Sequence, residues 1–376
     1  MSWEEKRLGD VLTLKRGYDL TEAQRQDGDI PVVSSSGITG SHNVAMVKAP
    51  GVVTGRYGTM GEVFYVERDF WPHNTALYVR DFKGNNPRFI AYFLKNVLRG
   101  TNSNKAAVPG VNRNDLHERR VLAPDISTQG RIVEHLESLD DLIENNRRRI
   151  KLLEDAARLL YREWFVHLRF PGHEHVKMVD GVPEGWARKV VPDLIAINPT
   201  ERIERGREAW YVPMAALSET GMIVDRGDFE RRTVHTAVKF RTNDVLLARI
   251  TPCLENGKTG FVYFLDEGDV ACGSTEFIIL RGISVSPYFV YCLARTYDFR
   301  EHAIKSMIGS SGRQRVQAGC FDEYGVFLPP SSLLSEFDDS VAPMFKQIAV
   351  LDQQTEKLRQ ARDLLLPRLM SGELSV

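Results

Sequence analysis

The sequence predicts an α+β protein in which two repeated α/β domains are separated by two long helices. These helices are expected to form an antiparallel intramolecular coiled coil with pseudo-twofold symmetry. Two observations predict this fold class: an apolar heptad pattern occurs twice, and Gly-punctuated β-rich segments precede each copy. The expected boundaries are 1–125 for the first domain, 126–168 for the first long helix, 169–185 for a linker, 186–330 for the second domain, and 331–376 for the second long helix with the C-terminal tail.

The first long helix is expected to run from the stretch "DISTQ" to about Phe165, with Ser127 or Thr128 as its N-cap. Its apolar positions advance alternately by four and three residues, which is the seam of a coiled coil. The seam positions are Ile132, Leu136, Leu139, Ile143, Asn146, Ile150, Leu153, Ala157, Leu160 and Trp164.

The same seam recurs 205 residues later, where eight of ten positions are again apolar. The second set is Phe337, Val341, Met344, Ile348, Leu351, Thr355, Leu358, Arg362, Leu365 and Leu369. Pro343 fits only a first helical turn, so the main run is expected to start near Ser340, and Pro367 is expected to end or kink it. The polar residues Asn146 and Thr355 either fix the pairing register or lie at exposed bends.

The apolar surface of both helices is wider than one seam requires. Five apolar residues each lie one position before a seam residue: Leu142, Leu152, Leu159, Val350 and Leu364. Either the domains pack over this stripe, or helices of other proteins dock on it.

The repeat extends upstream of the helices. The stretch "VLAP" at 121–124 matches "VFLP" at 326–329, and "FIAYFL" at 89–94 resembles "FVYCLA" at 289–294. Each copy predicts a shorter helix with proline in its first turn, at 87–98 and 286–297. Two similar heads at a fixed spacing suit a regular polymer, and duplex DNA repeats every 34–36 Å. Simple spacing or oligomerisation is the other role of such helices.

Composition excludes several classes of protein. The chain is 26% charged and has no apolar run near 18 residues, so we expect no transmembrane helix. Its first residues are polar, unlike a signal peptide, so we expect a cytoplasmic protein. The four cysteines form no CxxC pair and are expected to be reduced thiols rather than zinc ligands.

No stretch of the sequence predicts catalysis, a cofactor or a metal site. "LENGKTG" at 254–260 follows Pro252, where a phosphate-binding loop requires glycine, so Gly257 and Lys258 are expected in a β-turn. The Asn-Pro-Pro-aromatic tetrapeptide of base amino-methylation is absent. His173 and His175 lie in the expected linker without a clear third ligand.

Charge indicates where nucleic acid would bind. The net charge is −1, but the segments 99–113 and 305–319, one before each long helix, carry cations and no acidic residue. Cations mixed with amides suit contacts to phosphates and base edges, whereas a merely solvated loop is the alternative. With neighbouring strand ends, the candidate DNA-binding residues are Arg56, Tyr57, Lys105, Arg113, Arg249, Lys258, Arg313, Gln314 and Arg315.

The chain resembles the specificity subunits of type I restriction–modification enzymes over nearly its whole length. The resemblance is carried by "ISTQGRIVEHLESLDDLIENNRRRIKLLEDAARLLYREWF" at 126–165, "LDQQTEKLRQARDLLLPRLMSGEL" at 351–374 and "TGRYGTMGEVFYV" at 54–66. It implies two target-recognition domains, each reading one half of a bipartite asymmetric DNA site, and helices that set the spacing between the halves.

The resemblance also implies the partners and a further part of the DNA surface. The expected partners are double-stranded DNA, two methylation subunits that dock on the helices, and restriction/translocase subunits, with no membrane and no cofactor of the chain's own. The opening "IPVVSSSGITG" implies that Ser34, Ser35 and Ser36 face DNA, and "AWYVPMAALSETG" differs from it, so the two half-sites are expected to differ. The alternative is a non-catalytic coiled-coil adaptor whose heads bind other proteins.

Overall fold

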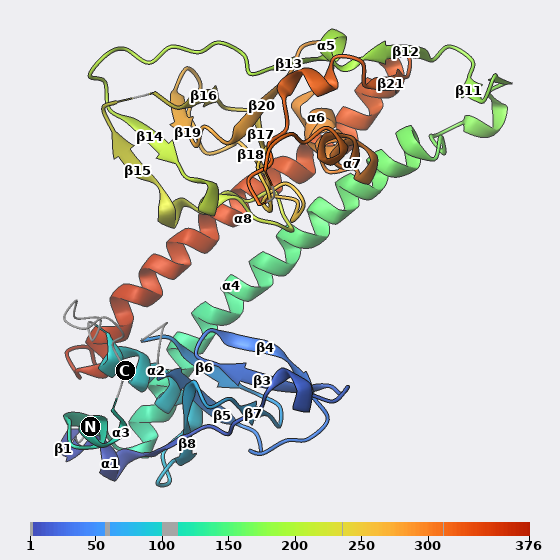
Figure 1. The fold of residues 1–376 in the computed structure, drawn as a ribbon. Helices are drawn as coiled ribbons and strands as arrows, with labels where there is room; N and C mark the ends of the chain where they lie inside the picture. Colours follow the sequence, from blue (N-terminus) through green and yellow to red (C-terminus); the bar gives the residue numbers. More distant parts are fainter. Residues whose placement is uncertain (1–2, 57–60, 100–111, 235, 311) are drawn as a thin grey trace. The chain divides into compact units, whose positions relative to one another are not determined.

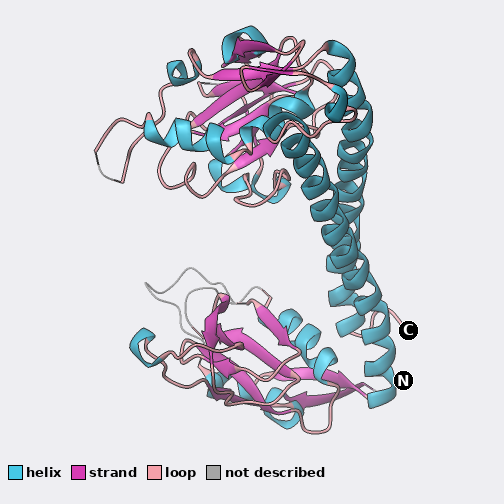
Figure 2. Cartoon of the chain, turned by 90° about the vertical axis from the view of Figure 1, so that its right-hand side faces the viewer, coloured by secondary structure: helices cyan, strands magenta, loops and turns pink. Residues whose placement is uncertain are grey.

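The computed structural model describes residues 3–56, 61–99, 112–234, 236–310 and 312–376, and its chain divides into two compact units (Figure 1). Unit 1 comprises Met1–Ile143 and Glu356–Val376, and unit 2 comprises Glu144–Thr355. Each unit combines β-sheets with helices, as the colouring in Figure 2 shows. The mixed α and β content predicted from the sequence is therefore confirmed.

Unit 1 contains two sheets and a strand pair. The four-stranded sheet is antiparallel, in the order β2 (Thr13–Arg16), β8 (Ala76–Asp81), β5 (Gly51–Gly55) and β6 (Val63–Val66). The three-stranded sheet has the order β4 (Gly37–His42), β3 (Ile30–Ser34) and β7 (Trp71–Pro72), and β3 and β7 are parallel. The pair joins β1 (Trp3–Arg7) to β9 (Arg120–Pro124). The helices are α1 (Leu8–Val11), α2 (Pro87–Leu98) and α3 (Arg113–His117).

Unit 2 repeats this topology with one additional strand, β16 (Val238–Arg241). Its first sheet has the order β13 (Ile195–Ile197), β20 (Phe277–Gly282), β17 (Val245–Ala248) and β18 (Thr259–Phe261). Its second has the order β15 (Glu230–Arg232), β14 (Ala209–Val212), β19 (Val270–Gly273) and β16, with β14 and β19 parallel. The pair joins β12 (Ala187–Val190) to β21 (Gly325–Leu328). A short hairpin, β10 (Met178–Val179) with β11 (Val182–Pro183), lies in the linker.

The corresponding strands appear in the same order along the chain and in the same pairings, so the duplication read from the sequence is present in the topology. In each unit, the last strand of the first sheet is followed by a helix that begins with a proline: α2, and α6 (Pro287–Ala294). Asn86 caps α2 and Ser286 caps α6. The second of these helices is shorter than predicted. It ends before Thr296, which caps a new helix, α7 (Tyr297–Lys305).

The first long helix, α4, covers Ile126–Tyr161 and continues into a π-helical turn at Arg162–Val166. The predicted N-cap was wrong by two or three residues. The carboxylate of Asp125 accepts a hydrogen bond from the Thr128 backbone N–H at 2.8 Å, so Asp125 caps the helix. An acidic cap also interacts favourably with the positive end of the helix dipole.

The second long helix, α8 (Ser331–Met370), differs from the prediction more. It begins nine residues before Ser340 and contains both Pro343 and Pro367. Each proline removes one backbone donor, but Phe337, Val341 and Ile348 are completely buried, and this packing holds the segment helical. The carbonyl that Pro367 leaves without an intrahelical donor belongs to Asp363, and the guanidinium of Arg99 donates to it at 3.3 Å.

Both long helices contribute to the core of each unit. In unit 1, Ile132 and Leu136 of α4 belong to one cluster with Leu366, Leu369 and Met370 of α8. In unit 2, Ala157 and Tyr161 of α4 belong to one cluster with Phe337, Val341 and Ile348 of α8. The division between the two compact units therefore falls within both long helices.

Two further features are the state of the cysteines and the apolar character of the helices. All four cysteines carry free thiols, and Cys272 and Cys292 are buried. Among the described residues, no helix is both long and apolar enough to cross a membrane.

Candidate nucleic-acid interface

The serines predicted to face DNA lie in the β3–β4 turn of unit 1. Ser34 is buried, and its hydroxyl donates to the Gly37 carbonyl at 3.2 Å and accepts from the Ser36 backbone N–H at 3.2 Å. Ser35 is half-buried, and its backbone N–H donates to the Thr75 hydroxyl at 3.4 Å. Only Ser36 is exposed, so Ser34 shapes the turn and Ser36 is the residue that can meet a ligand.

The other candidates in unit 1 lie on separate elements. Tyr57 and Lys105 lie outside the described residues. Arg56 is half-buried at the end of β5, where its backbone N–H donates to the Thr75 carbonyl at 3.0 Å. Arg113 is the exposed first residue of α3, and its Nε lies 3.5 Å from the Asn114 amide oxygen.

Arg249 and Lys258 of unit 2 have structural partners. The backbone of Arg249 pairs with Glu276 and Val316, which joins the end of β17 to the 308–316 segment. The Lys258 ammonium donates to the Met214 carbonyl at 3.2 Å, and Gly257, with a φ of +85°, forms the turn before β18. The predicted β-turn at Gly257 and Lys258 is therefore present, and Lys258 ties it to the chain after β14.

In the 305–319 segment, the side chain of Arg315 is held by an acidic partner, whereas Gln314 and Arg313 differ in their exposure. The guanidinium of Arg315 holds Glu276 through Nε at 3.0 Å and Nη2 at 2.8 Å, and these hydrogen bonds raise the pKa of Arg315. Gln314 is half-buried, and its backbone carbonyl accepts from the Thr251 N–H at 3.1 Å. Arg313 is exposed. Of this trio, Arg313 is the side chain most available for a phosphate.

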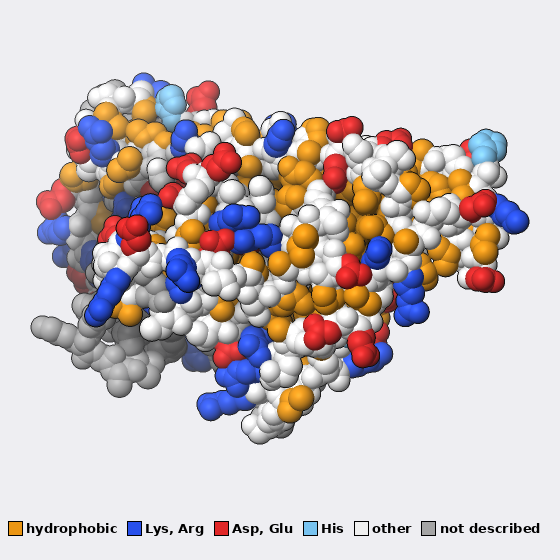
Figure 3. All heavy atoms as spheres, turned by 90° about the horizontal axis from the view of Figure 1, so that it is seen from above, with side chains coloured by type: hydrophobic (Ala, Val, Ile, Leu, Met, Phe, Trp, Pro, Cys, Tyr) orange, Lys and Arg blue, Asp and Glu red, His pale blue; other side chains and the backbone are white. Residues whose placement is uncertain are grey.

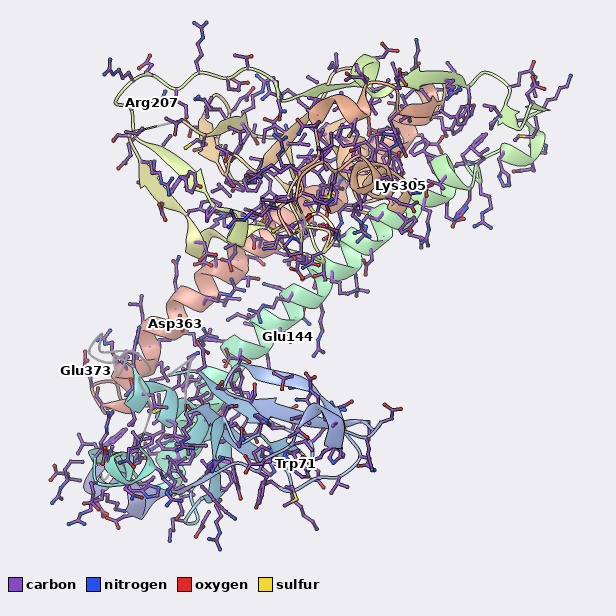
Figure 4. The ribbon with its side chains drawn as sticks, in the orientation of Figure 1. Trp71, Glu144, Arg207, Lys305, Asp363 and Glu373 are labelled. Carbon is purple, nitrogen blue, oxygen red and sulfur yellow. The ribbon has the colours of Figure 1, made fainter. Side chains whose placement is uncertain are left out.

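Lys305 lies in a helix and not in the loop where the sequence placed it. It is the last residue of α7 and pairs with Glu301, one turn earlier, at 3.0 Å. In Figure 4, Lys305 and Arg207, which precedes β14, lie on opposite sides of unit 2. The cations of this unit are therefore distributed over separate surfaces.

Charges of both signs are interspersed on the surface, as Figure 3 shows for one face. Part of the charge of unit 2 is neutralised internally. Arg281 pairs with the fully buried carboxylate of Asp244 at 2.6 Å and with Glu201 at 2.6 Å, and these contacts raise the pKa of Arg281, the Asp244 hydrogen bond most. Local groups of cations, and not the net charge, are therefore the features of this surface that could attract DNA.

Sequence reasoning missed the group of arginines and aromatic residues on β14 and β15. The guanidinium carbon of Arg231 lies 3.8 Å from the centre of the Trp210 ring, and that of Arg232 lies 3.3 Å from the centre of the Tyr211 ring. The dipeptides Trp-Tyr and Arg-Arg could have been noticed as a signal, but only the antiparallel register of the two strands brings them together.

The long helices present a second candidate surface. Every residue of the predicted seam is buried or half-buried, including the polar residues Asn146 and Thr355. The five residues beside the seam are exposed: Leu142 by 53%, Leu152 by 67%, Leu159 by 48%, Val350 by 48% and Leu364 by 71%. Neither head covers these side chains within its own unit, so this stripe is available to another protein.

The chain is similar to known proteins in sequence and in fold. The family model described as the type I restriction modification DNA specificity domain matches residues 1–155. The matched segment includes the first head and most of α4.

The curated proteins that the chain resembles are specificity subunits of type I restriction enzymes. It is 24% identical over 300 residues to the type I restriction enzyme MjaIX specificity subunit of Methanocaldococcus jannaschii, covering 76% of this chain and 67% of that protein. It is 27% identical over 199 residues to the EcoEI specificity subunit of Escherichia coli, covering 50% of this chain and 33% of that protein.

A solved structure extends the similarity in fold beyond the specificity domain. The S subunit of the type I restriction–modification system of M. genitalium matches with a TM-score of 0.60 and 13% identity, covering 98% of this chain and 96% of that one. The fold of a specificity subunit is therefore present along nearly the whole chain.

Proposed function

We propose that this chain is the DNA-recognition subunit of a type I restriction–modification complex and has no catalytic role of its own. Each head reads one half of a bipartite asymmetric site. The two long helices pair antiparallel, set the distance between the heads, and dock two methylation subunits. Restriction/translocase subunits join the complete enzyme, and the reactions on DNA belong to these partners.

The observation that carries the proposal is the match of the specificity-domain family model to residues 1–155, combined with a second head that repeats the strand pairings of the first. Two heads of equal topology but different surface residues suit two half-sites of different sequence. The antiparallel pairing is supported by contacts within each unit. Arg362 of α8 bonds Asp140 of α4 at 2.8 Å, and the ring centres of Phe337 and Tyr161 lie 6.0 Å apart.

The docking of methylation subunits is supported by the exposed stripe beside the seam. A single apolar residue exposed on a charged helix is normal on a protein surface and needs no partner. Several such residues in one stripe resemble the contact positions of a larger helix bundle. Helices of a partner packed along Leu152, Leu159 and Val350 would bury them.

Mapping of methylated bases in the genome tests the function directly. With the gene intact, we expect methylation at one bipartite motif with two different half-sites, and deletion of this gene alone should remove it. Persistence of every methylated motif after deletion would refute the proposal. Purified complexes that retain no duplex DNA would instead favour an adaptor whose heads bind proteins.

The near-neutral charge leads to an expectation about the isolated chain. With a net charge of −1, it lacks the long-range attraction that drives DNA binding, so specific binding should require a methylation subunit. Gel-shift titrations over a range of salt concentrations, with and without that subunit, measure this dependence. Tight specific binding by the chain alone would contradict it.

A further inference from the structure

The two heads have edge strands at equivalent positions, of which one is uncharged and the other carries two arginines. In unit 1, β4 is at the edge of its sheet next to β3, and in unit 2, β15 occupies the same position next to β14. Between its buried ends β4 exposes Ile38, Thr39, Gly40 and Ser41, which carry no charge. All three residues of β15 are exposed, and two of them are Arg231 and Arg232. The heads therefore differ in charge at this equivalent edge strand.

Arg231 is held in a fixed orientation by an aromatic platform. It is directly opposite Trp210 in the β14–β15 register, and its guanidinium carbon lies 3.8 Å from the centre of the indole. The Trp210 ring in turn packs near Phe229, with ring centres 6.0 Å apart. A guanidinium stacked on an indole loses rotational freedom but keeps the donors at its edge available.

Among the described residues, the Arg231 guanidinium makes no hydrogen bond or ion pair. Its neighbour Arg232 differs in this respect, since its Nε and Nη2 donate to one carboxylate oxygen of Glu230 at 2.9 and 2.7 Å while its guanidinium stacks on Tyr211. The strand thus carries one guanidinium that is free to bind and one that is already bound.

We propose that Arg231 is a specificity-determining residue that reads a guanine in the half-site bound by the second head, with Trp210 as its positioning residue. This inference rests on the proposed function. The major groove admits a two-stranded β-ribbon, and the bidentate contact of arginine with O6 and N7 of guanine is the commonest specific contact there. The uncharged β4 makes no such contact, and its exposed Ile38 suits an apolar neighbour such as the thymine methyl group.

The test uses the full chain with its methylation subunits and duplexes that contain the mapped site. Guanines are replaced one at a time by 7-deazaguanine, which lacks the N7 acceptor. For the wild-type complex, one replacement, confined to one half-site, should weaken binding on the order of 10-fold or more. Arg231→Gln should weaken binding to the natural site by a similar factor and should remove the effect of that replacement.

Arg232→Gln is the matched control, because it removes a stacked arginine from the same strand but not an available donor. It should leave the response to 7-deazaguanine unchanged. Arg231→Lys keeps the charge without the planar fork, so it should also lose the response to that replacement. Melting curves of all three complexes check that folding is preserved.

Several results would overturn the inference. One is a site with no guanine in either half, and another is an Arg231→Gln complex that still responds to the same 7-deazaguanine. Equal weakening on all duplexes, with the response retained, would assign Arg231 to phosphate contact instead. If the wild-type complex shows no preference for the mapped site at all, the proposed function itself fails, and this result is distinct from the others.

Discussion

Arg362 shows how a single charged residue is accommodated in a helix seam. The sequence places it at an otherwise apolar position, where an unpaired cation would be costly. In unit 1 its guanidinium donates to Asp140 of α4 at 2.8 Å, and the other oxygen of Asp140 accepts from the Tyr92 hydroxyl at 2.6 Å. Burial and the hydrogen bond to Asp140 raise the pKa of Tyr92, so this phenol remains a donor.

Asp140→Asn should destabilise unit 1 by about 1–2 kcal/mol, because the partly buried Arg362 then keeps only the exposed carboxylate of Asp363 as a counter-charge. The double variant Asp140→Asn/Arg362→Leu should recover much of that loss, since the seam position becomes apolar. Chemical denaturation of the four proteins in this cycle gives the coupling. Independent, additive losses would contradict the ion-pair interpretation.

His117 is expected to make stability depend on pH. Its Nε2 accepts the Leu14 backbone N–H at 2.9 Å, which requires the neutral ring, and burial together with Arg113 lowers the pKa of His117. The unfolded chain, with a pKa of about 6.5, therefore binds this proton more readily than the folded chain does. The contribution is complete above about pH 6.5 and is lost as the pH falls toward the lowered pKa.

The free energy of unfolding, measured between pH 7.5 and 5.5, should thus fall less for His117→Gln than for the wild-type chain. Glutamine can still offer an acceptor oxygen but does not titrate. An identical pH dependence in both proteins would show that His117 does not contribute to it.

At the scale of elements, α8 contains two prolines in different surroundings. The carbonyl of Asp363, left free by Pro367, accepts a hydrogen bond from Arg99. The carbonyl left free by Pro343 is that of residue 339, on the exposed side of the helix. The packed seam holds the helix together at both sites, and Arg99 provides additional compensation at only one of them.

Pro343→Ala should therefore raise the free energy of unfolding, by up to about 3 kcal/mol, because it restores a helical hydrogen bond and a better helix former. Pro367→Ala should gain less, since its new N–H competes with Arg99 for the same carbonyl. Thermal unfolding of both variants and of the wild type shows which substitution raises the stability more. A larger gain at Pro367 would contradict this account of the two sites.

The sequence predicts some of these features and not others, for physical reasons. Heptad spacing is local information, so both long helices and their seams could be read directly from residues such as Ile132 and Val341. The uninterrupted course of α8 through Pro343 could not, because burial of Phe337 overrides the local penalty of that proline. Arg315 was predicted as a DNA contact, whereas its partner Glu276 is distant in sequence and is brought near by strand pairing. The stack of Arg231 on Trp210 depends on strand register in the same way.

At the scale of the whole molecule, the proposed spacer makes a quantitative prediction. Insertion of seven residues into both long helices, after Ile143 and after Thr355, preserves the heptad phase and lengthens each helix by about 10 Å. At about 3.4 Å per base pair, the gap between half-sites should grow by about three base pairs. Mapping of methylated motifs reads this gap directly.

The control insertion lengthens only one helix. It puts the two seams out of register and should abolish methylation of either motif. A doubly extended chain that still methylates the original motif would show that the helices do not set the spacing.

The division of the chain into units has a consequence for how such genes change. Unit 2 is one uninterrupted stretch, Glu144–Thr355, whereas unit 1 is assembled from two stretches on either side of it. Replacement of the middle of the reading frame therefore exchanges all of unit 2, and both junctions fall within helices. Under the proposed function, a single recombination tract would produce a mosaic subunit that keeps one half of its target and acquires a new other half.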